Sequence, residues 1–105
     1  MPKVVNLSGR KPQALRAGEV YIGHRVTRGG WDLPESKWAN PFKMGRDGTR
    51  EHVIALYEYF VRSKPELIAA LPELRGKDLA CWCAPLPCHG DVLLRLAELE
   101  AKGEL

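Results

Sequence analysis

Apolar side chains recur every three or four positions in two long segments of the chain, and this spacing is typical of amphipathic helices. The first segment predicts a helix capped by Thr49, with apolar positions at Val53, Leu56, Tyr57, Phe60 and Val61. The second predicts a final helix over 91–102, capped by Gly90 or Asp91, with apolar positions at Val92, Leu93, Leu96 and Leu99. Between them, Ser63-Lys64-Pro65-Glu66 has the capping-box pattern and predicts a short helix through Leu71.

Three apolar runs bounded by turn residues predict β-strands over 4–7, 19–26 and 77–83. Alternation along the third strand places Cys81 and Cys83 on one face and Trp82 on the other. Gly23 inside the second strand indicates a bulge or the close approach of another group. A single helical turn is a further expectation for Pro12 to Arg16.

The predicted order of elements is strand, strand, long loop, helix, helix, strand, helix. Helices between two strands imply a parallel strand pair joined by a crossover. We therefore expect one α/β domain over 1–105, with a mixed or parallel sheet, crossover helices and a Rossmann-like arrangement.

All three cysteines of the chain lie between Cys81 and Cys88, at the junction of the third strand and the final helix. Pro85 and Pro87 separate the two elements, because each proline lacks an N–H and fixes its φ angle. Ligands of open α/β sheets sit at the carboxyl ends of the strands, where this junction must lie. The sequence therefore predicts the functional site here.

Three interpretations of the cysteine segment stay open. In the first, the helix N-terminus favours the thiolate of Cys88, and His89 and Asp91 serve as its acid–base partners, so that all three are catalytic. In the second, Cys81, Cys83, Cys88 and His89 bind a metal ion, most plausibly zinc, as a Cys3His set. In the third, Cys81 and Cys83 are buried strand residues and His89 is an exposed residue at the helix start.

The segment 27–48 is long, rich in Gly and Pro, and carries aromatic and basic side chains, which is typical of a binding loop. Aromatic faces beside cations and amides suit stacking on a base and contact with phosphate or sugar. Equally, Trp38 and Phe42 could pack the loop onto the core. The two lone histidines, His24 and His52, are assigned structural and solvated roles. The predicted ligand-binding residues are Arg25, Lys37, Trp38, Asn40, Phe42, Cys81 and Cys83.

Composition narrows the class of protein. A net charge of +3 permits a nucleotide or nucleic-acid partner without demanding one. An odd cysteine count favours reduced thiols and a cytosolic location, and no signal or membrane segment is expected. The sequence therefore predicts a small cytoplasmic protein that binds or acts on a nucleotide or a nucleic-acid base. The alternative is a zinc-stabilised nucleic-acid-binding or interaction module without catalysis. Enzymatic activity and oligomeric state stay open.

The chain also resembles the family called domain of unknown function 4326, over nearly its full length. The segments that carry the resemblance are Val4-Val5-Asn6, Tyr21-Ile22-Gly23, Ser36 to Phe42, Leu79 to Cys83 and Cys88 to Leu93. His24 stands where the family pattern leads us to expect Arg. A fainter likeness, through Cys81 and the Cys88-His89 pair, is to domain of unknown function 488, whose Arg after Cys-His is Gly90 here. The resemblance supports the fold and the site, and it implies no reaction.

Overall fold

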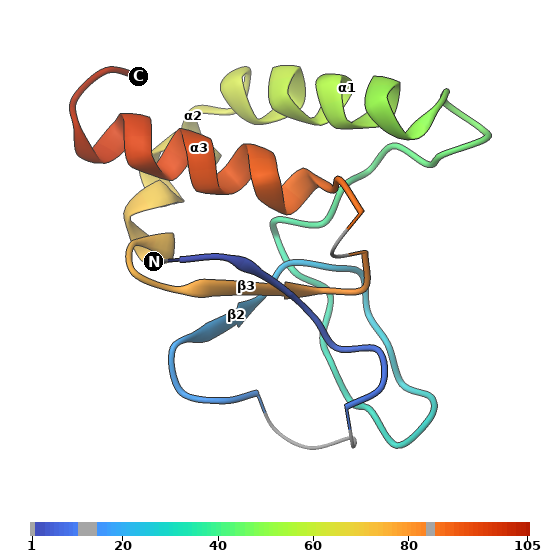
Figure 1. The fold of residues 1–105 in the computed structure, drawn as a ribbon. Helices are drawn as coiled ribbons and strands as arrows, with labels where there is room; N and C mark the ends of the chain where they lie inside the picture. Colours follow the sequence, from blue (N-terminus) through green and yellow to red (C-terminus); the bar gives the residue numbers. More distant parts are fainter. Residues whose placement is uncertain (1, 11–14, 84–85) are drawn as a thin grey trace.

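The computed structural model describes residues 2–10, 15–83 and 86–105. Within these described ranges, three strands, three α-helices and one 3-10 helix, η1, follow one another (Figure 1). In order they are β1 (Val4–Asn6), β2 (Glu19–Tyr21), α1 (Arg50–Arg62), α2 (Pro65–Ala70), η1 (Leu71–Leu74), β3 (Asp78–Cys81) and α3 (His89–Ala101). The α/β fold class is therefore confirmed.

The three strands form one parallel sheet in the order β1-β3-β2, so the last strand of the chain lies in the middle. Leu79 is opposite Val4 on one side and Val20 on the other. One further hydrogen bond extends each ladder, because Leu7 N–H donates to the Cys81 carbonyl over 2.9 Å and Ile22 N–H donates to the Ala80 carbonyl over 3.0 Å. All three strands thus point their carboxyl ends toward the same edge.

All three described strands are shorter than the sequence predicts, and β1 ends at Asn6 instead of Leu7. β2 ends at Tyr21 instead of reaching Val26, and β3 ends at Cys81 instead of Cys83. Beyond Ile22 the backbone turns, and Gly23 passes so close to the Tyr21 side chain that a Cβ atom there would lie 2.6 Å from the phenol oxygen. The predicted close approach at Gly23 is confirmed. Val26 then forms an antiparallel bridge with Leu33 outside the sheet.

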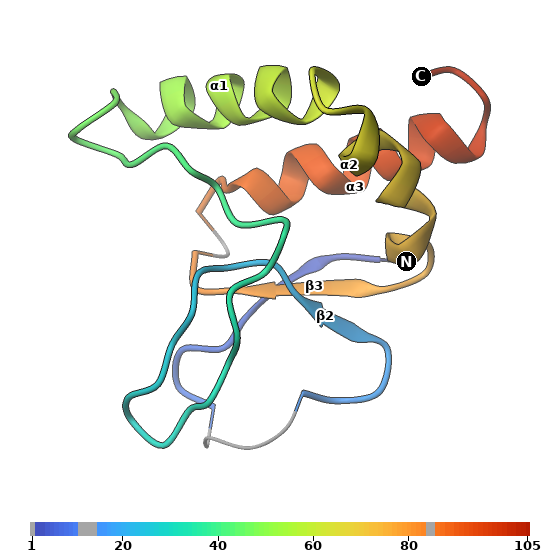
Figure 2. The same cartoon turned by 180° about the vertical axis from the view of Figure 1, so that it is seen from behind.

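The two faces of the sheet are covered differently. α1 and α3 lie on one face, whereas loops cover the other (Figures 1 and 2). Cys81 belongs to the hydrophobic cluster on the helix side and Trp82 packs against the cluster on the loop side, which confirms the predicted alternation. A Rossmann-like arrangement, with helices on both faces, is not confirmed, because the described helices share one side.

The helix boundaries correct two predicted caps. α1 begins as expected, since the Thr49 hydroxyl accepts the His52 N–H over 3.2 Å. α2 has no side-chain cap, and the Ser63 hydroxyl instead donates to the Phe60 carbonyl at the end of α1. α3 begins two residues early, with Cys88 rather than Gly90 or Asp91 as its N-cap.

Two expectations fall on residues outside the described ranges. The helical turn predicted for Pro12 to Arg16 lies mostly in 11–14, and part of the proline-containing break lies in 84–85. In the described part of the chain, no helix combines the length and the apolar character needed to cross a lipid bilayer.

Candidate functional site

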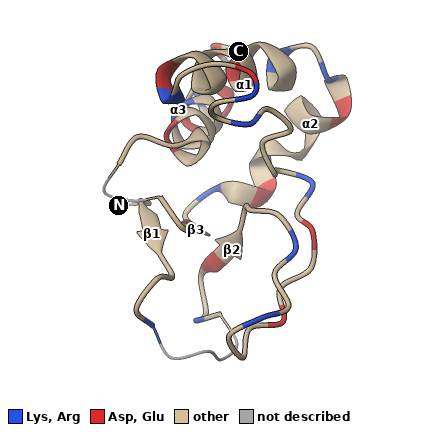
Figure 3. Cartoon of the chain, turned by 90° about the vertical axis from the view of Figure 1, so that its right-hand side faces the viewer, with Lys and Arg blue, Asp and Glu red and all other residues tan. Residues whose placement is uncertain are grey.

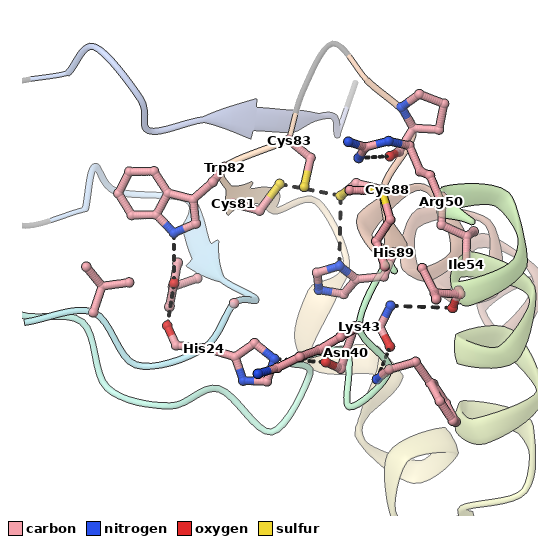
Figure 4. Close-up of a pocket in the computed structure, with 17 residues that line it drawn as sticks. His24, Asn40, Lys43, Arg50, Ile54, Cys81, Trp82, Cys83, Cys88 and His89 are labelled. Carbon is pink, nitrogen blue, oxygen red and sulfur yellow. Dashed lines mark hydrogen bonds between the residues drawn. The ribbon is translucent and has the colours of Figure 1, made fainter. Parts of the chain in front are cut away.

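The carboxyl edge of the sheet opens into a cavity of about 340 Å³. Its walls are the residues that follow β2 and β3, the first turn of α3, the first turns of α1, and the segment 40–44. Figure 4 shows side chains from all these regions pointing toward one space. The cavity therefore lies at the edge of the sheet where the sequence predicts the functional site.

The three cysteine sulfurs converge in this cavity, and all lie within 4.8 Å of one another. Cys81 ends β3, Cys83 lies two residues further on, and Cys88 caps α3, so two elements and their connection supply them. The Sγ atoms of Cys81 and Cys88 are 3.4 Å apart. All three are free thiols; Cys81 and Cys88 are buried, and Cys83 is half-buried.

The pKa values of the three thiols are shifted in different directions. Hydrogen bonds from the Cys81 and Cys88 thiols lower the pKa of Cys83 to about 2, and Arg50 contributes a further hydrogen bond. The hydrogen bond with Cys83, together with burial, raises the pKa of Cys81. The hydrogen bonds with Cys81 and Cys83, together with burial, raise the pKa of Cys88. The hydrogen bonds among the three sulfurs therefore favour the thiolate form at Cys83. The Cys88 sulfur accepts the Gly90 N–H at the helix N-terminus over 3.1 Å, which lowers its pKa, whereas the neighbouring sulfurs raise it. A role for a Cys88 thiolate stays a prediction.

His89 is buried, with 9% of its surface exposed, so its expected exposure at the helix start is wrong. Its ring lies edge-on against Tyr57, with the ring centroids 4.9 Å apart. Nε2 lies 2.8 Å from the Ile22 carbonyl oxygen, and Nδ1 lies 3.9 Å from the Sγ of Cys88. Burial lowers the pKa of His89, which keeps the imidazole neutral. Since a carbonyl can only accept, the single N–H is assigned to Nε2, and the lone pair of Nδ1 faces the cysteines.

Gly90 explains how these side chains reach the sheet. A Cβ atom at this position would lie 2.8 Å from a methyl group of Val4 and 2.9 Å from one of Ile22. The absence of a side chain lets the first turn of α3 rest directly on the strands. This close approach brings Cys88 and His89 to the edge where Cys81 ends.

Six of the residues singled out from the sequence line the cavity: Asn40, Phe42, Cys81, Cys83, Cys88 and His89. The side chain of Asn40 makes two structural hydrogen bonds. Its amide group donates to the Val53 carbonyl over 3.4 Å, and its oxygen accepts the Phe42 N–H over 3.0 Å. These bonds hold the segment 40–44 against α1. Phe42 packs edge-on against Phe60 and stays half-buried at the cavity wall.

The other four predicted residues do not line the cavity. Trp38 is only 2% exposed and belongs to the helix-side core, where its carbonyl accepts the Tyr57 hydroxyl over 2.7 Å. Lys37 pairs with Glu73 over 2.7 Å. Arg25 is exposed, and Asp91 accepts the backbone N–H of Cys88 over 3.0 Å as part of the helix cap. For Trp38, packing of the loop onto the core is therefore the correct interpretation.

Three basic residues of the cavity were not predicted as ligand contacts: His24, Lys43 and Arg50. Arg50 opens α1 and donates to the Pro87 carbonyl over 3.1 Å. A cation in the first turn of a helix opposes the helix dipole, and this was an available signal of a special role. The ring nitrogens of His24 lie 2.8 Å from a Glu35 carboxylate oxygen and 2.8 Å from the Asn40 carbonyl.

These features define a small α/β protein with a cysteine-rich cavity at the carboxyl edge of a parallel sheet. The chain matches the family described as Domain of unknown function (DUF4326) over residues 5–99, and it belongs to this family. It is 36% identical to "Uncharacterized protein R718" of Acanthamoeba polyphaga mimivirus, over 96% of this chain and 83% of the relative. It is 41% identical to "Uncharacterized 12.4 kDa protein in nrdA-td intergenic region" of Enterobacteria phage T4, over 56% of this chain and 57% of that protein. No solved structure matches.

Proposed function

We propose that the cavity binds a small anionic ligand that carries a planar ring, of the nucleotide class. The observation that carries this proposal is the charge of the lining, where Lys43 and Arg50 contribute cations and no described lining residue is an Asp or a Glu. A cavity of about 340 Å³ is within the range of small-molecule sites. Cations in the wall of a cavity attract phosphate, and Arg offers it a bidentate contact.

Aromatic side chains supply surfaces for the ring of such a ligand. Trp82 and Phe42 both line the cavity. The ring of Trp82 packs edge-on against Trp31, with centroids 5.6 Å apart, and its Nε1–H donates to the Tyr21 hydroxyl over 3.0 Å. A ring fixed in this way loses little freedom when a base stacks on it, which favours binding.

The distribution of charge favours a single nucleotide over a long nucleic acid. Figure 3 shows basic and acidic residues interspersed over the helices and along the loops. A protein that follows a phosphate backbone needs a continuous basic surface. The cations of the cavity are instead a local group, which suits one ligand with one or a few phosphates.

The place of the cavity also supports the proposal. In open parallel sheets, the Rossmann-like folds among them, ligands bind beyond the carboxyl ends of the strands. The free thiols support the proposed cytoplasmic location, where cysteines stay reduced. Catalysis by Cys88, His89 and Asp91 stays a prediction, because the described bonds of all three serve the helix cap and the contact with the sheet.

Titration calorimetry with the full chain tests the proposal. We expect nucleoside monophosphates to bind more tightly than the matching nucleosides and than inorganic phosphate. Arg50→Gln removes one charge-assisted contact and should weaken monophosphate binding roughly 10-fold. Lys43→Gln should act in the same direction. Arg28→Gln and Lys77→Gln are matched controls, because both cations are exposed and lie outside the cavity.

Two results would contradict the proposal. One is the absence of binding for every nucleoside monophosphate in the panel. The other is an affinity that Arg50→Gln and Lys43→Gln leave at the level of their controls. A single-stranded oligonucleotide that binds far more tightly than any mononucleotide, with a steep salt dependence, would replace the small ligand by a polymer.

A further inference from the structure

We infer that Cys81, Cys83, Cys88 and the Nδ1 atom of His89 form a zinc site at the floor of the cavity. The ligand atoms of this site are the sulfurs and the imidazole, so they differ from the cations proposed to bind the anionic ligand, although Arg50 lies beside both. The inference depends on how far apart the ligand atoms are, on the direction of the imidazole lone pair, and on the charges around the sulfurs.

The spacing of the sulfurs is close to what zinc requires. Zn–S bonds of about 2.3 Å at tetrahedral angles place two sulfurs about 3.8 Å apart. The Sγ atoms of Cys81 and Cys88 are 3.4 Å apart, and all three sulfurs lie within 4.8 Å of one another. Side-chain shifts below about 1 Å would therefore bring the sulfurs to tetrahedral positions. The backbone that carries Cys81 and Cys88 is already fixed by β3 and by the cap of α3.

The orientation of His89 makes it the fourth ligand. Its Nε2–H donates to the Ile22 carbonyl over 2.8 Å, which leaves the lone pair of Nδ1 directed at Cys88 (Figure 4). Histidines that bind metal commonly donate their other ring N–H to a carbonyl or a carboxylate in this way. A Zn–N bond of about 2.0 Å would place Nδ1 about 3.5 Å from each sulfur. It now lies 3.9 Å from the Cys88 Sγ and outside the group of atoms within 4.8 Å, so metal binding would draw the ring toward Cys81 and Cys83.

The surroundings can balance the charge of the loaded site. Three thiolates and one Zn²⁺ ion carry a net charge of −1, which a buried site must offset. The Gly90 N–H already donates to the Cys88 Sγ over 3.1 Å. Arg50 provides a positive charge and a hydrogen bond beside Cys83. Binding would release the thiol protons to solvent.

Four protein ligands leave no open position on the ion, which is typical of structural zinc. The ion would tie the end of β3 to the start of α3 across the break that contains Pro87. Its effect would be on stability, and it would leave the cations at the cavity mouth free to bind the anionic ligand.

Metal analysis of the full chain, purified in reducing buffer without chelators, is the first test. We expect one zinc ion per chain, together with a melting temperature that falls when a strong chelator removes it. Cobalt substitution should give intense thiolate-to-cobalt absorption. In the zinc-loaded protein, the nitrogen NMR signals of the imidazole should show Nδ1 of His89 bound to metal. Both spectra use the unmodified protein, so they do not depend on the folding of any variant.

Variants then assign the ligands. Removal of an outer-shell partner commonly weakens metal binding about 10- to 100-fold, so loss of a direct ligand should cost at least roughly 10-fold. We expect this loss for Cys83→Ser and for His89→Gln in competition with a colorimetric chelator. His52→Gln is the matched control, because His52 is exposed on α1. Protein that is free of zinc and takes up none on titration would overturn the inference. So would a His89→Gln variant that folds and binds zinc as tightly as the control.

Discussion

The two faces of the sheet are stabilised in different ways. Among the residues that the structure describes, fourteen buried ones form one continuous cluster on the helix side, whereas the cluster on the loop side has four. The loop side compensates with directional contacts: the edge-on pair of Trp31 and Trp82, the hydrogen bonds of Tyr21, and the bridge between Val26 and Leu33. The helix side therefore supplies most of the stability, while the loop side fixes the shape of one wall of the cavity.

A matched pair of leucine truncations tests this difference with the largest expected effect. Leu96 is fully buried on the helix side, and Leu33 is 6% exposed on the loop side. Leu→Ala changes in cores cost about 2–5 kcal/mol, and the cost is smaller where the surroundings can collapse into the space. We expect Leu96→Ala to lower the free energy of unfolding by about 3–4 kcal/mol and Leu33→Ala by about 2 kcal/mol, because loops can move further than packed helices.

Denaturant unfolding of both variants checks the pair. Unchanged denaturant slopes would show that the folded and unfolded states stay comparable. Equal losses of stability, or a larger loss for Leu33→Ala, would mean that the loops are packed as rigidly as the helices. Either result would contradict the conclusion that the helix side supplies most of the stability.

A smaller effect is expected from the hydrogen bonds of the loop side. The Tyr21 hydroxyl donates to the His24 carbonyl over 2.5 Å and accepts the Trp82 Nε1–H over 3.0 Å. Tyr21→Phe should lower the free energy of unfolding by about 1–2 kcal/mol, because two partly buried groups lose their partner. Tyr59→Phe is the matched control, since Tyr59 is 76% exposed and should change stability by less than about 0.5 kcal/mol. Thermal unfolding followed by circular dichroism measures both, and equal midpoints would show that the Tyr21 bonds contribute nothing.

The smallest effect concerns an ion pair at the start of β2. Arg10 donates to both carboxylate oxygens of Glu19, over 2.9 and 2.6 Å, and these bonds lower the pKa of Glu19 from its ordinary 4.5 to about 2. Glu19→Gln should lower the free energy of unfolding by about 1 kcal/mol at pH 7.

The pH dependence of this loss follows from the sign of the shift. The folded state has the lower pKa, so the contribution of Glu19 is complete above pH 4.5 and disappears as the pH falls toward 2. The unfolding curves of wild type and variant should therefore converge over that interval. A difference that stays constant from pH 7 to pH 2, or an equal loss in the exposed control Glu104→Gln, would contradict the assigned ion pair.

The sequence predicted the elements well where one strong periodicity acts alone. α1 and its cap Thr49 are confirmed, because apolar spacing and a capping hydroxyl agree. β2 is shorter than predicted, since Gly23 and Val26 fall in a strand-like pattern but lie outside the sheet, where the backbone turns as Gly23 passes the Tyr21 ring. Strand propensity is a local property of the sequence, so it does not predict the contact between Gly23 and the Tyr21 ring.

The position of the candidate site was predictable from the sequence, but the roles of its residues were only partly predictable. A strand that ends in cysteines before a helix start indicated the carboxyl edge of the sheet. The burial of Trp38 and His89 depends on which face of the loop or helix meets the core, and spacing alone does not specify this for a loop. Lys43 and Arg50 come from a segment distant in sequence, so only the fold brings them to the cysteines.

The central place of β3 has a consequence for how the protein is made. β1 and β2 are not neighbours in the sheet, and each pairs only with β3, which spans Asp78–Cys81. During synthesis, β1 and β2 therefore have no sheet partner until β3 has left the ribosome, when about three quarters of this chain has been made. Chains whose strand edges stay unpaired for a long time are prone to aggregation. We expect nascent chains that stop before β3 to stay unfolded, and the sheet to form in a single late step.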